Sequence, residues 1–400
     1  MRRFHSPDPY LILATLVLVI FGLIMVSSAS VVESFQTTGS NTYYFWRQTV
    51  IALVGLGFWY ILQKVDYHQY RSIATSLLFF GLLLLVLVFV PGLGVEAGGS
   101  YRWIGVGELT LQVTEVMKLG LIIYLAYWFE RKGPKITNFY YTFLPFILIM
   151  ITICGLIMAE PDMGTTMVII GIGMAMYFSA GGSWHHIISI IVLWGLAVWG
   201  LILAAPYRLA RLLTFLNPEN DPLGAGYHIN QALIALGSGG LFGFGFGKSR
   251  QKFNFLPEAS SDSIFAIIGE ELGFIGIVLL VMLPFAVFIW RGLQTAKRAP
   301  DIFGRLLAVG ITAWIGVQAV INIGSIIGLM PLTGVPLPFI SQGGTSLVFV
   351  LIASGILLNI SRQTIYTKGD EDPFGWWGHI WSRFAGIIRR SSYFEKRPTK

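Results

Sequence analysis

Long apolar stretches alternate with short polar segments along nearly the whole chain. A membrane-spanning helix needs about 20 predominantly apolar residues, so each such stretch predicts one transmembrane helix. The pattern therefore predicts an all-α, polytopic integral membrane protein with about ten spans, near 10–30, 47–63, 72–91, 112–130, 139–158, 163–181, 187–205, 264–290, 306–328 and 342–360.

Composition and charge support this class. The chain is 55% hydrophobic and 12% charged, whereas a soluble domain carries about 25% charged residues. Lys and Arg concentrate in the segments that a cytoplasmic N-terminus would place inside the cell, which predicts that both termini are cytoplasmic. The formal net charge of +7 is then a signal of topology and of attraction to anionic lipid, and no nucleic-acid partner is expected.

Two polar regions are expected on the outer side. The first, 92–111, is rich in glycine, which serves turns or the close approach of backbone to a ligand. The second, 206–262, joins spans seven and eight and is too long for an ordinary connection. We expect short helices on the outer membrane face there, with an apolar stripe of Leu209, Leu212, Leu213 and Leu216.

The chain divides into a membrane domain, 1–362, and a basic cytoplasmic tail, 363–400. The tail contains Trp376, Trp377 and Trp381, which are typical of anchors at the inner membrane surface, although a partner-binding helix has the same signature.

Asp262 is the most informative single residue. It ends the long polar region and directly precedes the apolar run that starts at Ser263, so its carboxylate lies where water gives way to lipid. Desolvation raises the pKa of a carboxylate and makes it a stronger base, as general-base catalysis requires. The alternative is an acidic N-cap on the helix that follows.

Other charged residues extend this candidate site. Glu115 and Lys118 lie three apart, on one face of the fourth span, and either line a functional cavity or form an ion pair that fixes helix packing. The basic run of Lys248, Arg250 and Lys252, which includes Gln251, could bind a diphosphate or a lipid headgroup.

Several loops carry further candidates. Arg102 and Trp103 pair a cation with an aromatic ring in the first outer region, and Glu258 precedes Asp262. Ser341 and Gln342 follow a proline-rich run in an irregular loop, which is tolerated at membrane depth only where protein or a wet cavity covers it. The Glu160-Pro161-Asp162 turn either caps the next helix or holds a divalent cation. No zinc-ligand spacing or dinucleotide fingerprint occurs, so no organic cofactor is expected.

Several runs of residues together resemble the SEDS family of bacterial cell-wall polymerases, which includes FtsW, RodA and SpoVE. They are Met25-Val26-Ser27-Ser28-Ala29-Ser30, Tyr101-Arg102-Trp103-Ile104, Glu160-Pro161-Asp162-Met163-Gly164-Thr165, Phe215-Leu216-Asn217-Pro218, Asp221-Pro222-Leu223-Gly224-Ala225-Gly226-Tyr227, Ala235-Leu236-Gly237-Ser238-Gly239-Gly240, Leu256-Pro257-Glu258-Ala259, Ile268-Gly269-Glu270-Glu271-Leu272-Gly273 and Thr333-Gly334-Val335-Pro336-Leu337-Pro338-Phe339. The opening span and the Ser249–Phe253 run look most like FtsW, the division member.

The resemblance implies a glycosyltransferase that polymerises lipid II into β-1,4 glycan strands at the outer face of the plasma membrane, during septal wall synthesis. It places the essential acid at Asp262 and further functional positions at Arg102, Glu115, Lys118, Ser341 and Gln342. We expect Lys248, Arg250, Lys252, Arg102 or a divalent cation such as Mg²⁺ to neutralise the departing diphosphate. The competing hypotheses are a lipid II flippase and a non-catalytic scaffold that activates a partner.

The implied partners are lipid II and the nascent glycan strand, a class B penicillin-binding protein as transpeptidase, other division proteins and membrane lipid. The chain also departs from the family pattern, because Ser260 and Ser263 stand where the family commonly has histidine and phenylalanine, and Glu160 stands where glutamine is usual.

Overall fold

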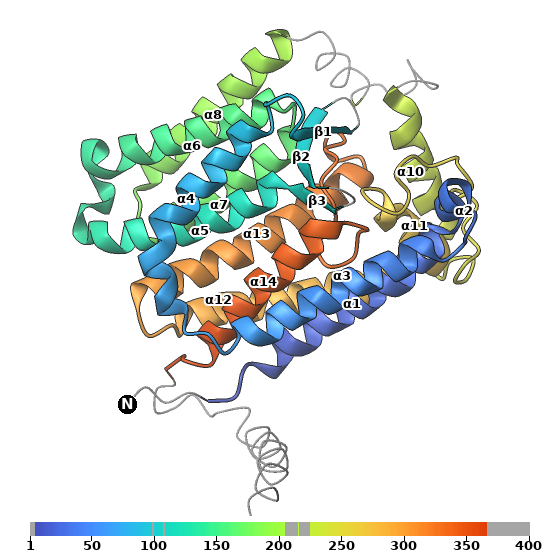
Figure 1. Cartoon of the computed structure of the whole chain (residues 1–400), viewed down its shortest axis with the longest axis horizontal. Helices are drawn as coiled ribbons and strands as arrows, with labels where there is room; N and C mark the ends of the chain where they lie inside the picture. The colour runs from blue at the N-terminus through green and yellow to red at the C-terminus, as the bar shows by residue number, and fades with distance from the viewer. Residues whose placement is uncertain (1–4, 98–99, 107–108, 205–214, 216–224, 366–400) are drawn as a thin grey trace, which may run out of the picture.

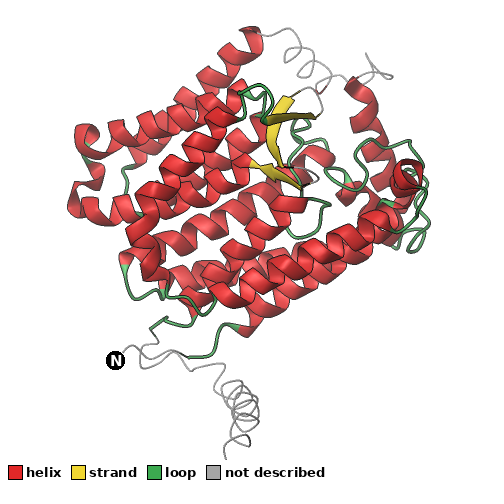
Figure 2. Ribbon diagram, in the orientation of Figure 1, coloured by secondary structure: helices red, strands yellow, loops and turns green. Residues whose placement is uncertain are grey.

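A computed structural model describes all residues except 1–4, 98–99, 107–108, 205–214, 216–224 and 366–400. The described chain is almost entirely helical (Figures 1 and 2). The principal helices are α1 (Pro9–Ala29), α2 (Val31–Thr38), α3 (Tyr43–Leu62), α4 (Tyr70–Leu87), α5 (Val113–Lys132), α6 (Leu144–Ala159), α7 (Met163–Ser179), α8 (Trp184–Ala204), α10 (Ala225–Gly239), α11 (Ile264–Ile277), α12 (Leu283–Lys297), α13 (Ile302–Ile326) and α14 (Gly344–Ser361).

The predicted all-α membrane architecture is confirmed, and each of the ten predicted spans overlaps a helix or a pair of continuous helices. In the described residues, seven helices are long and apolar enough to cross a membrane, and α7 and part of α8 are shorter apolar helices. Helix α5 is less apolar because it contains Glu115, Lys118, Glu130, Arg131 and Lys132. The count of ten crossings and the orientation of the termini stay predictions. The predicted stripe of Leu209, Leu212, Leu213 and Leu216 lies outside the described residues, and so do the tryptophans of the tail.

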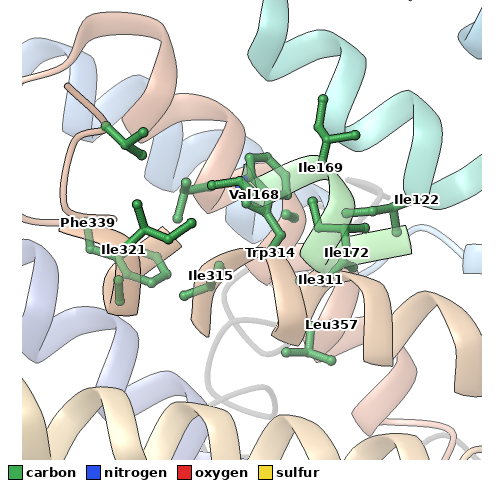
Figure 3. Close-up of a cluster of buried hydrophobic side chains, with 14 of the residues drawn as sticks. Ile122, Val168, Ile169, Ile172, Ile311, Trp314, Ile315, Ile321, Phe339 and Leu357 are labelled. Carbon is green, nitrogen blue, oxygen red and sulfur yellow. The ribbon is translucent and has the colours of Figure 1, made fainter. Parts of the chain in front are cut away.

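Helix α13 lies at the centre of the bundle and packs against α5, α7 and α12. Figure 3 shows Ile311, Trp314 and Ile315 of α13 meeting side chains of α5, α7 and α14 in one apolar cluster. All three side chains are fully buried. Because lipid tails are as apolar as these side chains, close packing rather than exclusion of water stabilises such a core.

Helices α11 and α12 are joined through a π-helical turn at Val278–Met282 and form one continuous segment. Helix α1 packs against this segment, and polar contacts link the two at both ends. At one end Arg291 donates from Nε to Asp8 Oδ2 over 2.7 Å. At the other, Ser28 Oγ donates to Glu271 Oε1 over 2.6 Å. In each helix about 20 residues separate the two contacts, or about 30 Å at 1.5 Å per residue, which is the thickness of the hydrocarbon core. From this spacing we infer that the two contacts lie near the two edges of the hydrocarbon layer along these helices.

Helix α11 is interrupted at Gly273, whose φ of 68° is left-handed and leaves backbone groups without helical partners. The loop after α10 supplies those partners. Phe244 N donates to Glu270 O over 3.0 Å, and Phe274 N donates to Gly240 O over 2.9 Å. An interrupted helix near membrane depth is tolerated because protein backbone satisfies the exposed groups in this way.

The glycine-rich outer region forms a small antiparallel sheet, where the sequence led us to expect turns. Strands β1 (Gly94–Ala97), β2 (Ser100–Val106) and β3 (Leu109–Gln112) lie in that order, next to the outer end of α5 (Figures 1 and 2). Ala97 pairs with Ser100, which leaves two residues for the connection, the length of a tight hairpin. A prediction based on hydrophobic runs missed these strands, because glycines interrupt the apolar residues in this region.

The loop 331–343 packs on α1 at Gly22, and this contact allows a test of the packing. A Cβ atom at Gly22 would lie 2.7 Å from Ile340 Cα and from Phe339 O, both of them backbone atoms. We expect Gly22→Ala to lower the free energy of unfolding by about 1–3 kcal/mol, the usual cost of overpacking. Thermal unfolding of the purified protein in detergent measures this change.

Gly57→Ala is the matched control, because a Cβ atom at Gly57 of α3 meets nothing within 4 Å. Alanine favours helix over glycine, so this variant should be as stable as the native protein or more stable. Equal melting temperatures for the two variants would contradict the packing described here.

Candidate active site

A cavity of about 1960 Å³ lies between α3, the small sheet, α10, the loop before α11, the end of α13, the loop 331–336 and the start of α14. Five of the predicted site residues line it: Arg102, Trp103, Glu258, Asp262 and Gln342. These residues are far apart in sequence, and the helical bundle brings them together around one space.

The main chain at Asp262 is held from two sides. Asn322 of α13 donates from Nδ2 to Asp262 O over 2.8 Å and to Val335 O over 2.8 Å. From the 331–343 loop, Ser341 Oγ donates to Ser261 O over 2.7 Å, and Gln342 N donates to Ser260 O over 2.9 Å. These bonds leave the Asp262 side chain to line the cavity, with Oδ2 beside Gly334.

The alternative interpretation of Asp262 as an N-cap is wrong. The N-cap position of α11 is occupied by Ser263, and its side chain makes no capping hydrogen bond. Within the described part of the chain, the Asp262 carboxylate accepts no hydrogen bond, so it is available to a ligand in the cavity.

Burial and, to a smaller extent, the negative charges of Glu258 and Asp162 raise the pKa of Asp262 to about 7, against the opposing effect of the Arg102 guanidinium. A carboxylate with a pKa near 7 is a stronger base than an ordinary aspartate and is still ionised in half of the molecules at neutral pH. The shift has the direction that general-base catalysis requires, and the catalytic role of Asp262 stays a prediction.

Arg102 of β2 binds the turn between α6 and α7. Its NH2 group donates to Pro161 O over 2.9 Å, and its Nε lies 3.9 Å from Asp162 Oδ2. Asp162 caps α7 by accepting from Thr165 N over 2.9 Å. Burial, together with the charge of Asp162, raises the pKa of Glu160 in the same turn to about 8. Arg102 is thus the counter-charge to a group of acids at the cavity.

These acids do not assemble into a metal site. In the part of the chain that the structure describes, no group of three or more His, Cys, Asp or Glu side chains could hold a metal ion. The carboxylates that line the cavity are those of Glu258 and Asp262.

Glu115, Lys118 and Ser341 lie behind the cavity wall. Lys118 Nζ donates to Glu115 Oε1 over 2.8 Å and to Gln318 Oε1 over 2.9 Å, and all three side chains are buried. Gln318 in turn donates to Pro336 O over 2.9 Å. This chain of bonds supports the loop that bears Thr333–Pro336, so Glu115 and Lys118 form the ion pair named as the alternative and contribute to the cavity through that loop.

The basic run lies elsewhere, because Lys248, Arg250, Gln251 and Lys252 are absent from the lining of this cavity. Lys252 Nζ is buried and donates to Glu271 Oε1 over 3.1 Å and to Ser28 Oγ over 3.0 Å. Glu270 accepts from Arg250 N over 2.9 Å and from Ser249 Oγ. The run is therefore bound to the C-terminal end of α1 and to α11, and it does not line the cavity that contains Asp262.

Four further residues that line the cavity were missed from the sequence. Arg47 and the neighbouring Trp46 line it from α3, and His228 of α10 lines it while its Nε2 lies 2.6 Å from Ser263 Oγ. Asn322 lines it from α13. Arg47 was detectable as a cation at the outer end of a span, but no local motif distinguishes His228 or Asn322 from ordinary helix residues.

Known proteins match this chain over most of its length. A family model described as "Cell cycle protein" (FTSW_RODA_SPOVE) matches residues 9–366. "Stage V sporulation protein E" of Bacillus subtilis is 44% identical over 361 residues, covering 90% of this chain and 98% of its own. A "Probable peptidoglycan glycosyltransferase FtsW" of Trichlorobacter lovleyi is 41% identical over 360 residues, with 90% and 94% covered.

Solved structures agree. A chain from the structure described as "Structural coordination of polymerization and crosslinking by a peptidoglycan synthase complex" has a TM-score of 0.76 and 28% identity, covering 90% of this chain and 99% of its own. Thermus thermophilus "Rod shape determining protein RodA" has a TM-score of 0.67 and 27% identity, with the same coverage. The resemblance seen in the sequence is thereby confirmed at the level of the family: this multi-pass membrane protein belongs to the FtsW/RodA/SpoVE, or SEDS, family.

Proposed function

We propose that this chain is a peptidoglycan glycosyltransferase that polymerises lipid II at the outer face of the plasma membrane, with Asp262 as the general base. The observation that carries the proposal is the Asp262 carboxylate in a large cavity, free of hydrogen bonds within the described residues and with a raised pKa. The relatives named as peptidoglycan glycosyltransferases support the same activity.

The cavity suits two saccharides. Its volume of about 1960 Å³ exceeds the roughly 300–1,000 Å³ of a pocket for one drug-sized ligand. Polar groups line one part of it, including Gln112, Asn322 and Gln342, and apolar side chains of α3 such as Val50 and Val54 line another. A lipid-linked sugar presents the same combination of a polar head and an apolar chain.

In the proposed reaction the 4-hydroxyl of the acceptor sugar attacks the anomeric carbon of the donor. Its proton passes to Asp262 as the new carbon–oxygen bond forms, and the bond from the anomeric carbon to the diphosphate breaks with inversion, which gives a β-1,4 linkage. An inverting glycosidase needs a second carboxyl group to protonate its leaving group. A diphosphate leaves as an anion without a proton, so one base is sufficient here.

Cations at the cavity would stabilise the charge that develops on the diphosphate. Arg102 and Arg47 are the cations that line the cavity in the described residues, and they replace Lys248, Arg250 and Lys252 in this role. A divalent cation is the alternative counter-charge, and assays with and without Mg²⁺ distinguish the two.

We further propose that the chain acts in septal wall synthesis with a class B penicillin-binding protein as transpeptidase, together with other division proteins. The solved synthase complex that resembles this chain supports a partner that cross-links. The relatives of this chain include both a sporulation protein and FtsW proteins, so depletion and localisation of this chain in dividing cells are the test of the septal role.

Asp262→Asn is expected to reduce polymerisation by about 10²–10⁴-fold, the usual contribution of general-base catalysis, because the amide cannot accept the proton. Purified protein with lipid II in detergent, followed by the length of the glycan chains, measures this directly. The melting temperature is the control for folding and should be unchanged, since the side chain makes no hydrogen bond in the described structure.

The same assay separates the competing hypotheses. A flippase would exchange lipid II between leaflets of a vesicle and form no glycan in detergent. A scaffold would retain its effect on a partner transpeptidase in the Asp262→Asn variant. Full polymerisation by a folded Asp262→Asn protein would refute the role of Asp262.

The raised pKa also predicts a pH profile. The ionised form of Asp262 is the active base, so the rate should rise as the pH increases through about 7 and level off above it. Glu258→Gln removes a negative charge that raises the pKa of Asp262, and the rising limb should move to lower pH.

Arg102→Gln provides the opposite comparison, because it removes the positive charge that lowers this pKa, and the limb should move to higher pH. The rate of chain growth between pH 5 and pH 9, about the range over which such a group titrates, gives the three profiles. If the rate rises at the same pH in both variants as in the native protein, a group other than Asp262 controls the rate.

A further inference from the structure

The loop between α10 and α11 exposes large apolar side chains. We refer to residues 240–256 as the aromatic loop. Six of its side chains are exposed, with Phe242 at 77%, and they are Leu241, Phe242, Phe244, Phe246, Phe253 and Phe255. Contiguous exposed apolar surface of this kind is rare in water and marks contact with a protein or a membrane.

The depth of the aromatic loop follows from its contacts. Lys252 Nζ donates to both Ser28 Oγ and Glu271 Oε1, the pair inferred above to lie near one edge of the hydrocarbon layer. Gly245 N donates to Glu271 O over 2.9 Å, and Ile275 N donates to Leu241 O over 3.1 Å. The loop therefore lies level with the end of the spans, at the depth where aromatic side chains concentrate in membrane proteins.

The exposed patch is continuous with a lipid-facing surface. Phe274 is 59% exposed on α11, directly beside Gly240, and Leu279 and Leu283 continue the exposed apolar surface along the same span. In a spanning helix such side chains face lipid. The aromatic loop extends this surface at its outer edge, in the region of α2, α10 and α11 in Figure 1.

Two cations lie within the same loop. Lys248 and Arg250 are exposed, and among the residues that the structure describes no carboxylate lies within ion-pair distance of either. The Arg250 guanidinium carbon lies 5.5 Å from the centre of the Phe244 ring, so charge and aromatic surface are adjacent. Lys252, in contrast, is buried and paired with Glu271. Cations beside interfacial aromatic residues are suited to lipid phosphates.

We propose that the aromatic loop is an anchor at the outer membrane surface, which inserts its phenylalanines among the lipids and binds the phosphates of anionic lipids through Lys248 and Arg250. The loop leads directly into Pro257–Asp262, which forms part of the cavity wall. Anchoring would therefore hold the segment that bears Asp262 at a fixed height above the lipid surface.

Lipid contact can be measured on the full chain in nanodiscs that contain no lipid-linked sugar, so the result is independent of the proposed catalysis. Phe242→Cys and, separately, Phe246→Cys are labelled with a small fluorophore. We expect spin-labelled phosphatidylcholine to quench both labels strongly. Two sites are used because one of the variants could fold poorly. Labelling of the native chain measures the background from Cys154, the single cysteine, which is buried.

A label at Asn41, an exposed polar residue in the turn between α2 and α3, is the matched control and should be quenched less. Labels at 242 and 246 that are quenched by an aqueous reagent and not by lipid would overturn the proposal. Such a result would mean that the aromatic loop stands in water and awaits a protein partner.

A separate experiment tests whether Lys248 and Arg250 bind the phosphates of anionic lipids. With the label at 246, phosphatidylglycerol that carries the spin label should quench more than phosphatidylcholine at the same mole fraction. Lys248→Gln with Arg250→Gln should remove that preference, since each cation near the surface contributes about five-fold to the attraction of anionic lipid. Arg131→Gln with Lys132→Gln, at the other end of the bundle, is the control and should leave it unchanged. A preference that survives the 248/250 change would overturn phosphate binding by the loop.

Discussion

The amide of Asn322 is the contact on which the candidate site depends. From a buried position near the C-terminal end of α13 it donates to the carbonyl oxygens of Asp262 and Val335, each over 2.8 Å, and so joins the two loops that form the cavity wall. A buried carbonyl without a partner costs about 1–3 kcal/mol, so both loops are strongly favoured in these positions. Ser341 of the 331–343 loop adds a third bond, to Ser261 O.

The residues that support the cavity wall differ from the residue that we propose as the base. Glu115, Lys118 and Gln318 form a buried polar chain that ends on Pro336 O, and they act on the cavity through the loop that they hold. The carboxylate of Asp262 is left without a hydrogen bond in the described structure, and burial with neighbouring acids raises its pKa. An acid that is firmly held through its backbone and unpaired at its side chain is suited to accept a proton from a bound hydroxyl group.

The outer ends of the spans contain two groups of polar residues with different surroundings. Arg102 lines the cavity, and its Nε lies 3.9 Å from Asp162 Oδ2 in the turn between α6 and α7. Lys252 is bound to Glu271 and Ser28 at the end of α1, and this contact also fixes the loop that precedes Asp262. The two groups are separate, because Arg102 lines the cavity and Lys252 does not.

Much of the fold was predictable, because hydrophobic runs of membrane length leave little choice of secondary structure. The position of Asp262 at the cavity could also be anticipated, since an acid at the end of a polar region and next to a span stands out in such a sequence. Tertiary contacts were not readable from local pattern. A diphosphate site was predicted at Lys248, Arg250 and Lys252. In the structure, the buried Glu270 accepts from the Arg250 backbone, and the buried Glu271 accepts from Lys252 Nζ. Arg47 and His228 reach the cavity from distant helices, and the small sheet was hidden by its glycines.

A structure of the Asp262→Asn protein with lipid II bound would test the central claim most directly. We expect the acceptor sugar in the cavity, with its 4-hydroxyl oxygen within about 3 Å of the side chain at position 262, the distance that proton transfer requires. A saccharide bound away from that side chain, for example against Lys248 and Arg250, would contradict it.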